Sequence, residues 1–124
     1  MVETKPSILV VDDDDAVRTM VVRQLSALYV VHQAADASAA FAILRDISAP
    51  KVIICDVMMP GMSGMQLVER IKQRPALKHV PIIFLTAKTD AADVVEGINA
   101  GARHYMTKPF KMNDLLARVA KLVA

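Results

Sequence analysis

The stretch IICDVMMPGMSG, residues 53–64, places an apolar run directly before a carboxylate and then breaks at Pro60 and Gly61. An apolar run that ends at turn-forming residues is typical of a buried strand followed by a loop. Burying a carboxylate such as that of Asp56 is costly unless a partner compensates for it. Asp56 therefore either reaches solvent at the end of its strand or is held within a site.

Similar apolar runs recur along the chain, five in all: ILVV (8–11), YVVHQA (29–34), VIIC (52–55), PIIFLT (81–86) and HYMT (104–107). Between them, apolar residues recur with the helical period, for example at residues 17–28, 67–71 and 115–123. Continuous apolar strands that alternate with helices predict a parallel sheet covered on both faces. The chain is therefore predicted to be one doubly wound α/β domain, residues 1–124, with five strands and five helices.

The bulk composition excludes several classes of protein. The 124 residues are 54% hydrophobic, which predicts a globular domain, and the single cysteine cannot form an internal disulfide. No apolar run approaches the length of a membrane span, and the first residues lack the layout of a signal peptide. A net charge of +2 is too small to indicate nucleic-acid binding. We therefore expect a cytoplasmic protein that binds neither membrane nor nucleic acid.

Polar residues stand where four of the predicted strands end. Asp12 and Asp13 follow the first strand, Asp56 follows the third, Thr86 ends the fourth, and Lys108 follows the fifth. In a doubly wound sheet these ends share one edge, where ligands bind. Two carboxylates about 4 Å apart repel each other by about 4 kcal/mol at an effective dielectric of 20, so three together need raised pKa values or a cation. Carboxylate oxygens suit Mg²⁺, and an aspartate beside it can accept a phosphoryl group.

Four segments together, ILVVDDD, IICDVMMPGMSG, IIFLTA and GARHYMTKPF, resemble the receiver domain of bacterial response regulators over essentially the whole chain. The resemblance implies a flavodoxin-like fold with strand order 2-1-3-4-5, as in the chemotaxis response regulator. It also implies a phosphoacceptor switch in a two-component phosphorelay. A sensor histidine kinase or a phosphotransfer protein would donate the phosphoryl group to Asp56, with Mg²⁺ as the cofactor and Mn²⁺ as a substitute.

The same resemblance assigns the metal ligands. Asp13 and Asp56 would bind Mg²⁺ directly together with the backbone carbonyl of Met58, and Asp12 would act on the ion mainly through water. By contrast, Asp14 and Asp15 are predicted to lie in the first turn of the following helix, where its dipole favours acids. Within the strand, Cys55 is predicted to be an inert core residue.

The resemblance also assigns a switch. Lys108 would pair with Asp56 and then with the phosphoryl oxygens, and the Lys108–Pro109 bond is expected to be cis. Thr86 would hydrogen-bond the phosphoryl group and move with it, and the orientation of Tyr105 would follow Thr86. The output partner, whose identity is not predicted, would bind a face formed by the helix around Val94, strand 104–107 and helix 115–123.

Two further expectations concern the surface beside these residues. Met58 and Lys88, which stand two positions after Asp56 and Thr86, lack the groups that orient an attacking water, so the phosphorylated form is expected to be long-lived. Val94, Arg103 and His104 replace the charged residues with which related transcription factors dimerise, leaving Asp114 and Arg118 unmatched. The chain is therefore expected to be a monomer, or a dimer built in another way.

Two alternatives remain open from the sequence. An aspartate-nucleophile phosphatase of the haloacid dehalogenase type needs a second aspartate two residues after the nucleophile, where this chain has Met58. A pseudo-receiver would keep the fold without the chemistry, although every acidic, hydroxyl and lysine position is filled here. The preferred interpretation is a signalling switch that assists only its own phosphorylation and dephosphorylation, and is not otherwise an enzyme.

Overall fold

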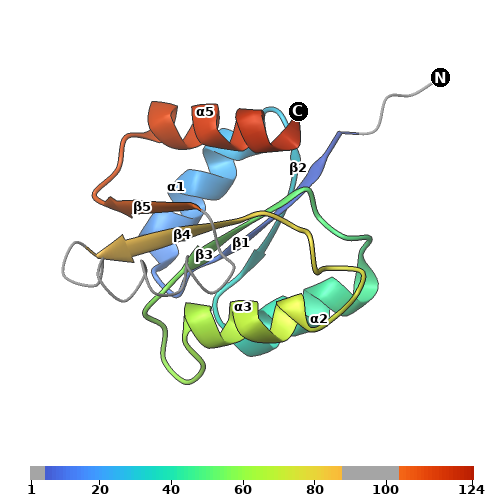
Figure 1. Ribbon diagram of the computed structural model, residues 1–124. Coiled ribbons are helices and arrows are strands. Elements are labelled where there is room, and N and C mark those ends of the chain that lie inside the picture. The colour runs from blue at the N-terminus through green and yellow to red at the C-terminus, as the bar shows by residue number, and fades with distance from the viewer. Residues whose placement is uncertain (1–4, 88–103) are drawn as a thin grey trace.

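Five parallel strands form one sheet in the order β2-β1-β3-β4-β5, as predicted. The structure is a computed structural model that describes residues 5–87 and 104–124. In chain order the described elements are β1 (Ser7–Val11), α1 (Asp15–Leu25), β2 (Val30–Ala34), α2 (Ala37–Asp46), β3 (Val52–Asp56), α3 (Gly64–Lys72), β4 (Ile82–Ala87), β5 (His104–Lys108) and α5 (Met112–Val123) (Figure 1).

The described residues contain four of the five predicted helices. The helix expected around Val94 falls in residues 88–103, outside the described ranges. Among the described helices, none is long and apolar enough to cross a membrane. Strand limits differ from the predicted ones by a residue or so, and Lys108 closes β5 instead of following it.

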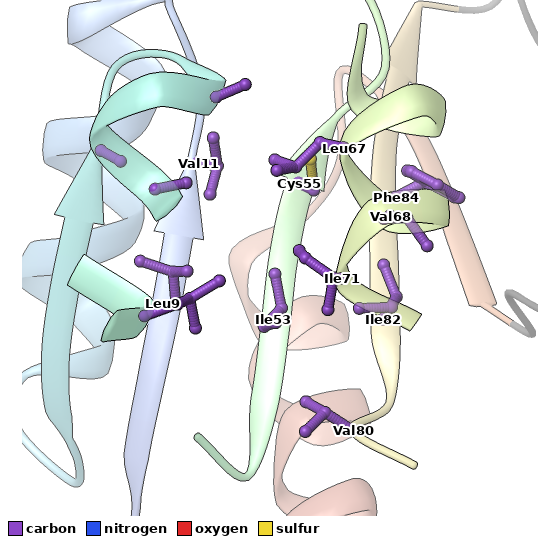
Figure 2. Packing of buried hydrophobic residues seen from close by; sticks show 14 of the residues in the cluster. Leu9, Val11, Ile53, Cys55, Leu67, Val68, Ile71, Val80, Ile82 and Phe84 are labelled. Atoms are coloured by element: carbon purple, nitrogen blue, oxygen red, sulfur yellow. The ribbon is translucent and has the colours of Figure 1, made fainter. Parts of the chain in front are cut away.

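Helices cover both faces of the sheet, with α1 and α5 on one face and α2 and α3 on the other (Figure 1). The split follows from the alternation of side chains along each strand, since Leu9 of β1 contributes to one core cluster and Val10 to the other. Figure 2 shows Leu67 and Ile71 of α3 packed over the sheet, where they meet Ile53 of β3 and Phe84 of β4. β1, β3 and β4 are therefore buried on both faces, and their carboxyl ends are the ones that present Asp12, Asp56 and Thr86.

Local signals set where the helices begin. The Asp14 carboxylate accepts hydrogen bonds from the amides of Ala16 and Val17, which caps α1. Asp15 lies in the first turn, as predicted, whereas Asp14 is the cap residue directly before it. Ser63 and Gln66 form a capping box at the start of α3. Both helices thus begin within a few residues of the strand ends that carry the acids.

Gly64, the first residue of α3, lies directly against the backbone of Asp56. A Cβ atom at Gly64 would be 2.0 Å from the Asp56 carbonyl oxygen and 3.1 Å from the Cys55 sulfur. The Gly64 amide also donates to the Val57 carbonyl oxygen over 2.8 Å. A hydrogen atom is therefore the only side chain that fits here, and the contact fixes the end of β3 against the start of α3.

We predict that Gly64→Ala lowers the free energy of unfolding by about 1 to 3 kcal/mol, because the methyl group forces the β3 end and α3 apart. The matched control is Gly61→Ala in the same loop. Gly61 has a φ of 78° but open space around the added atom, so that change costs only backbone strain of about 1 kcal/mol. Urea unfolding measures both. A Gly64→Ala variant that is no less stable than Gly61→Ala would contradict the close-contact account.

Candidate functional site

Three carboxylates meet at the carboxyl ends of the central strands. Asp12 follows β1, Asp13 is next, and Asp56 is the last residue of the neighbouring strand β3. A carboxylate oxygen of each lies within 4.8 Å of one from each of the others. Asp12 is fully buried and Asp56 is 6% exposed, whereas Asp13 is exposed. The structure thus brings together the three acids that the sequence placed at separate strand ends.

Asp12 is held at each of its polar groups. Its amide donates to the Ala34 carbonyl oxygen over 3.1 Å, and its own carbonyl oxygen accepts from Arg18 over 2.7 Å. Its Oδ1 accepts from the Asp14 amide over 2.9 Å, and its Oδ2 accepts from Lys108 Nζ over 3.1 Å. Because both carboxylate oxygens already accept hydrogen bonds, Asp12 is suited to supply fixed negative charge to the cluster.

Lys108 bridges two of the acids. Its Nζ lies 3.5 Å from Asp56 Oδ1, which is the predicted ion pair, and 3.1 Å from Asp12 Oδ2, which is a second and closer partner. Burial disfavours the charge on Lys108, but the hydrogen bond and charge of Asp12, together with Asp56, outweigh it and raise the pKa of this lysine. The ammonium group is therefore charged at neutral pH. The Lys108–Pro109 bond is cis, as expected.

The surroundings of Asp56 disfavour its negative charge. Burial, followed by the charge of Asp12, raises the pKa of Asp56 to about 7, while Lys108 acts in the opposite direction. Burial also raises the pKa of the neighbouring Cys55 thiol, with the charges of Asp56 and Asp12 adding to the effect. Cys55 is fully buried, in agreement with its prediction as an inert core residue.

Thr86 and Tyr105 lie on the two strands beyond β3. Leu85 is the register partner of Asp56, so the fully buried Thr86 stands one residue further toward the same edge. Its hydroxyl donates to the Ala87 carbonyl oxygen over 3.1 Å. Tyr105 is half-buried against the core on the α2–α3 face, and its carbonyl oxygen accepts from Arg118 over 3.2 Å.

Of the remaining predicted residues, the structure describes Met58 and His104. Met58 is 62% exposed in the loop after β3. Lys88, Val94 and Arg103 lie outside the described residues, so their predicted roles stay predictions. His104 opens β5.

The donor set fits a small, hard divalent cation. Among residues 5–87 and 104–124, the three carboxylates are paired with the ammonium of Lys108 alone, which leaves an excess of negative charge at this edge of the sheet. Carboxylate oxygens are the donors that Mg²⁺ and Mn²⁺ prefer. Each of the three acids can offer one oxygen to such an ion, and both oxygens of Asp12 also accept a hydrogen bond.

Arg18 is a residue of the site that sequence reasoning missed. It lies one turn into α1, pairs with Asp15 and donates to the Asp12 backbone. The spacing of Asp15 and Arg18 indicates an ion pair on a helix surface. The bond to the Asp12 carbonyl joins two segments through the fold, and the sequence carries no signal for it.

Comparisons with known proteins agree with this geometry. A family model described as the response regulator receiver domain matches residues 8–120. The chain is 38% identical over 117 residues to the response regulator PleD of Caulobacter vibrioides, covering 93% of this chain and 25% of PleD. It is also 38% identical over 114 residues to the phosphate regulon transcriptional regulatory protein PhoB of Pseudomonas aeruginosa, covering 91% and 49%.

Among solved structures, the chemotaxis response regulator CheY4 of Vibrio cholerae has a TM-score of 0.86 and 35% sequence identity, covering 96% of this chain and 99% of that one. The chain spans 25% of the length of PleD and 49% of that of PhoB.

Without divalent metal, we predict that Asp56→Asn is more stable than the parent chain at neutral pH and equal to it near pH 4. Below about pH 4 the carboxyl is protonated in both folded and unfolded chains. As pH rises toward 7, the unfolded chain releases the proton that the folded chain keeps, so the parent loses stability. The gain at pH 8 should be on the order of 1 kcal/mol, since solvent at the sheet edge screens part of the effect.

Urea unfolding in a chelator between pH 4 and pH 8 measures this difference. The control is Glu69→Gln, which removes an exposed carboxyl from α3 and should show no such trend. A stability difference between Asp56→Asn and the parent that stays the same across this range would show that burial does not destabilise the Asp56 charge.

Proposed function

The chain belongs to the response regulator receiver domain family, and from that premise we propose that it is a switch that carries a phosphoryl group on Asp56. The observation that supports Asp56 most directly is its place as the last residue of β3. There it lies beside Asp12 and Asp13 and 3.5 Å from the Lys108 ammonium. Receiver domains work in two-component systems, so the proposed donor is the phosphohistidine of a sensor histidine kinase or of a phosphotransfer protein.

The proposed reaction needs the Asp56 carboxylate in its charged form. One of its oxygens would form a bond to phosphorus as the phosphorus–nitrogen bond of the donor breaks, and the histidine nitrogen would keep the electron pair and take a proton from solvent. Lys108 favours the charged carboxylate and can then pair with the phosphoryl oxygens. A divalent ion bound here would neutralise charge on the phosphoryl oxygens.

We assign the ion to Asp13, Asp56 and the backbone carbonyl of Met58, with Asp12 acting through water. The engagement of both Asp12 oxygens by Asp14 and Lys108 supports this division, since each oxygen then has one fewer lone pair to offer the ion. Mg²⁺ is the proposed cofactor, and Mn²⁺ would substitute for it.

The proposed switch begins at Thr86. Its hydroxyl is committed to the Ala87 carbonyl oxygen without phosphate, so binding a phosphoryl oxygen would require it to turn. Tyr105 lies on the adjacent strand and would respond to that movement. The change would reach an output partner through β5, α5 and the residues around Val94, the last outside the described ranges. We propose that the chain acts as a monomer.

The two alternative functions lack a supporting observation. A phosphatase of the haloacid dehalogenase type requires an acid where the exposed thioether of Met58 stands. A pseudo-receiver would not need Lys108 or the three acids. In this chain the Lys108 ammonium and the three carboxylates are all present and lie close together.

We predict that the parent chain gains one phosphoryl group from acetyl phosphate and Mg²⁺, and that Asp56→Asn does not. Intact mass over time measures the gain. The matched control is Asp46→Asn, which removes an exposed carboxyl at the end of α2 and should be phosphorylated at the parental rate. An Asp56→Asn variant that is phosphorylated as fast as the parent would exclude Asp56 as the acceptor.

We further predict that the double change Met58→Asn with Lys88→Glu speeds loss of the phosphoryl group by on the order of tenfold. The introduced amide and carboxylate can orient an attacking water, which the original thioether and ammonium cannot do. Met58 is exposed, so its replacement should barely alter folding stability. Phosphate release after removal of the donor measures the rate, with Met20→Asn as an exposed control on α1. Equal or slower release from the double variant would refute the role of both positions.

A further inference from the structure

Arg18 joins three separate parts of the fold through one guanidinium group. Its Nη1 donates to the Asp12 carbonyl oxygen over 2.7 Å, and its Nε donates to Gln33 Oε1 over 3.1 Å. Its Nη2 pairs with the Asp15 carboxylate. The Arg18 side chain is only 14% exposed. The guanidinium therefore fixes the loop after β1 to α1 and to the edge strand β2.

The carbonyl that Arg18 holds belongs to the peptide unit between Asp12 and Asp13. Asp13 is exposed, and its neighbours on both sides are anchored, Asp12 by Arg18 and Lys108 and Asp14 by its capping bonds to α1. The orientation of the Asp13 side chain is thus set by a peptide whose direction depends on Arg18. A planar guanidinium can donate in three directions at once, whereas a lysine ammonium on a flexible stem cannot reproduce this fork.

We propose that Arg18 is a positioning residue for the metal site, holding the Asp12–Asp13 peptide so that the Asp13 carboxylate stays beside Asp56. This inference rests on the proposed function, in which Asp13 and Asp56 bind the divalent ion. Arg18 touches neither the ion nor the phosphoryl group and acts only through the backbone.

The charge of Arg18 and its positioning role have opposite effects on metal binding. A positive charge near three acids repels a cation, so charge alone predicts that removing Arg18 tightens Mg²⁺ binding. Loss of positioning predicts weaker binding, because the acid oxygens no longer share a fixed arrangement. The sign of the change therefore separates the two effects.

The experiment measures Mg²⁺ affinity by calorimetry or amide NMR shifts without any phosphodonor. Arg18→Met should weaken affinity about tenfold, as is typical when a residue that supports metal ligands is lost. Arg18→Lys keeps the charge but not the fork and should weaken affinity about threefold. The matched control Arg23→Met removes an exposed arginine from the last turn of α1 and should change affinity less than about twofold.

A second measurement separates positioning from general damage to the fold. At saturating Mg²⁺, phosphorylation of Arg18→Met by acetyl phosphate should return to within about twofold of the parental rate, because the defect lies in metal binding. At low Mg²⁺ it should be slower. A rate that stays low at saturating Mg²⁺, or an affinity that is unchanged or tighter in Arg18→Met and Arg18→Lys, would overturn the proposal.

Asp13→Ala serves as the reference for the metal site itself. If it binds Mg²⁺ as tightly as the parent, the proposed metal site is wrong. If it loses affinity and the Arg18 variants do not, only the positioning role of Arg18 is wrong.

Discussion

The constraint on which the structure depends is the burial of two carboxylates, those of Asp12 and Asp56, at the ends of adjacent central strands. Such burial is unfavourable unless hydrogen bonds and opposite charge compensate for it. Lys108 provides the opposite charge from β5, across the ends of β3 and β4. Its ammonium does not balance three acids, and burial, followed by the charge of Asp12, raises the pKa of Asp56. A divalent cation is the simplest group that would restore the balance.

Backbone contacts hold the acids in this arrangement. Gly64 packs directly against the Asp56 carbonyl, so β3 can end beside the start of α3. The Asp14 amide and the Arg18 guanidinium fix Asp12 from its side chain and from its carbonyl. Each contact ties a strand end to the following helix, and the helices are anchored in turn by the two core clusters on the faces of the sheet. The core thus holds these acids together at one edge of the sheet, where a divalent cation and a phosphoryl group could bind side by side.

The parts of this account that the sequence predicts are those that depend on local pattern. Apolar runs and helical periods locate the elements, and strand ends locate Asp12, Asp13, Asp56, Thr86 and Lys108. Which oxygen each side chain contacts depends on tertiary structure. The preference of Lys108 for Asp12, the bond from Thr86 to Ala87 and the reach of Arg18 to the Asp12 carbonyl were not predictable for that reason. The strand order, by contrast, came from the family resemblance.

The central claim is that Asp56, and not one of its two acidic neighbours, accepts the phosphoryl group. The most direct measurement is to treat the chain with acetyl phosphate and Mg²⁺, reduce the acyl phosphate with borohydride, digest with trypsin and sequence the peptides by mass spectrometry. Asp56 lies in a peptide bounded by Lys51 and Arg70, whereas Asp12 and Asp13 lie in one that ends at Arg18, so the two outcomes are distinct. The account predicts reduction of Asp56 to homoserine. Reduction at Asp12 or Asp13 would contradict it.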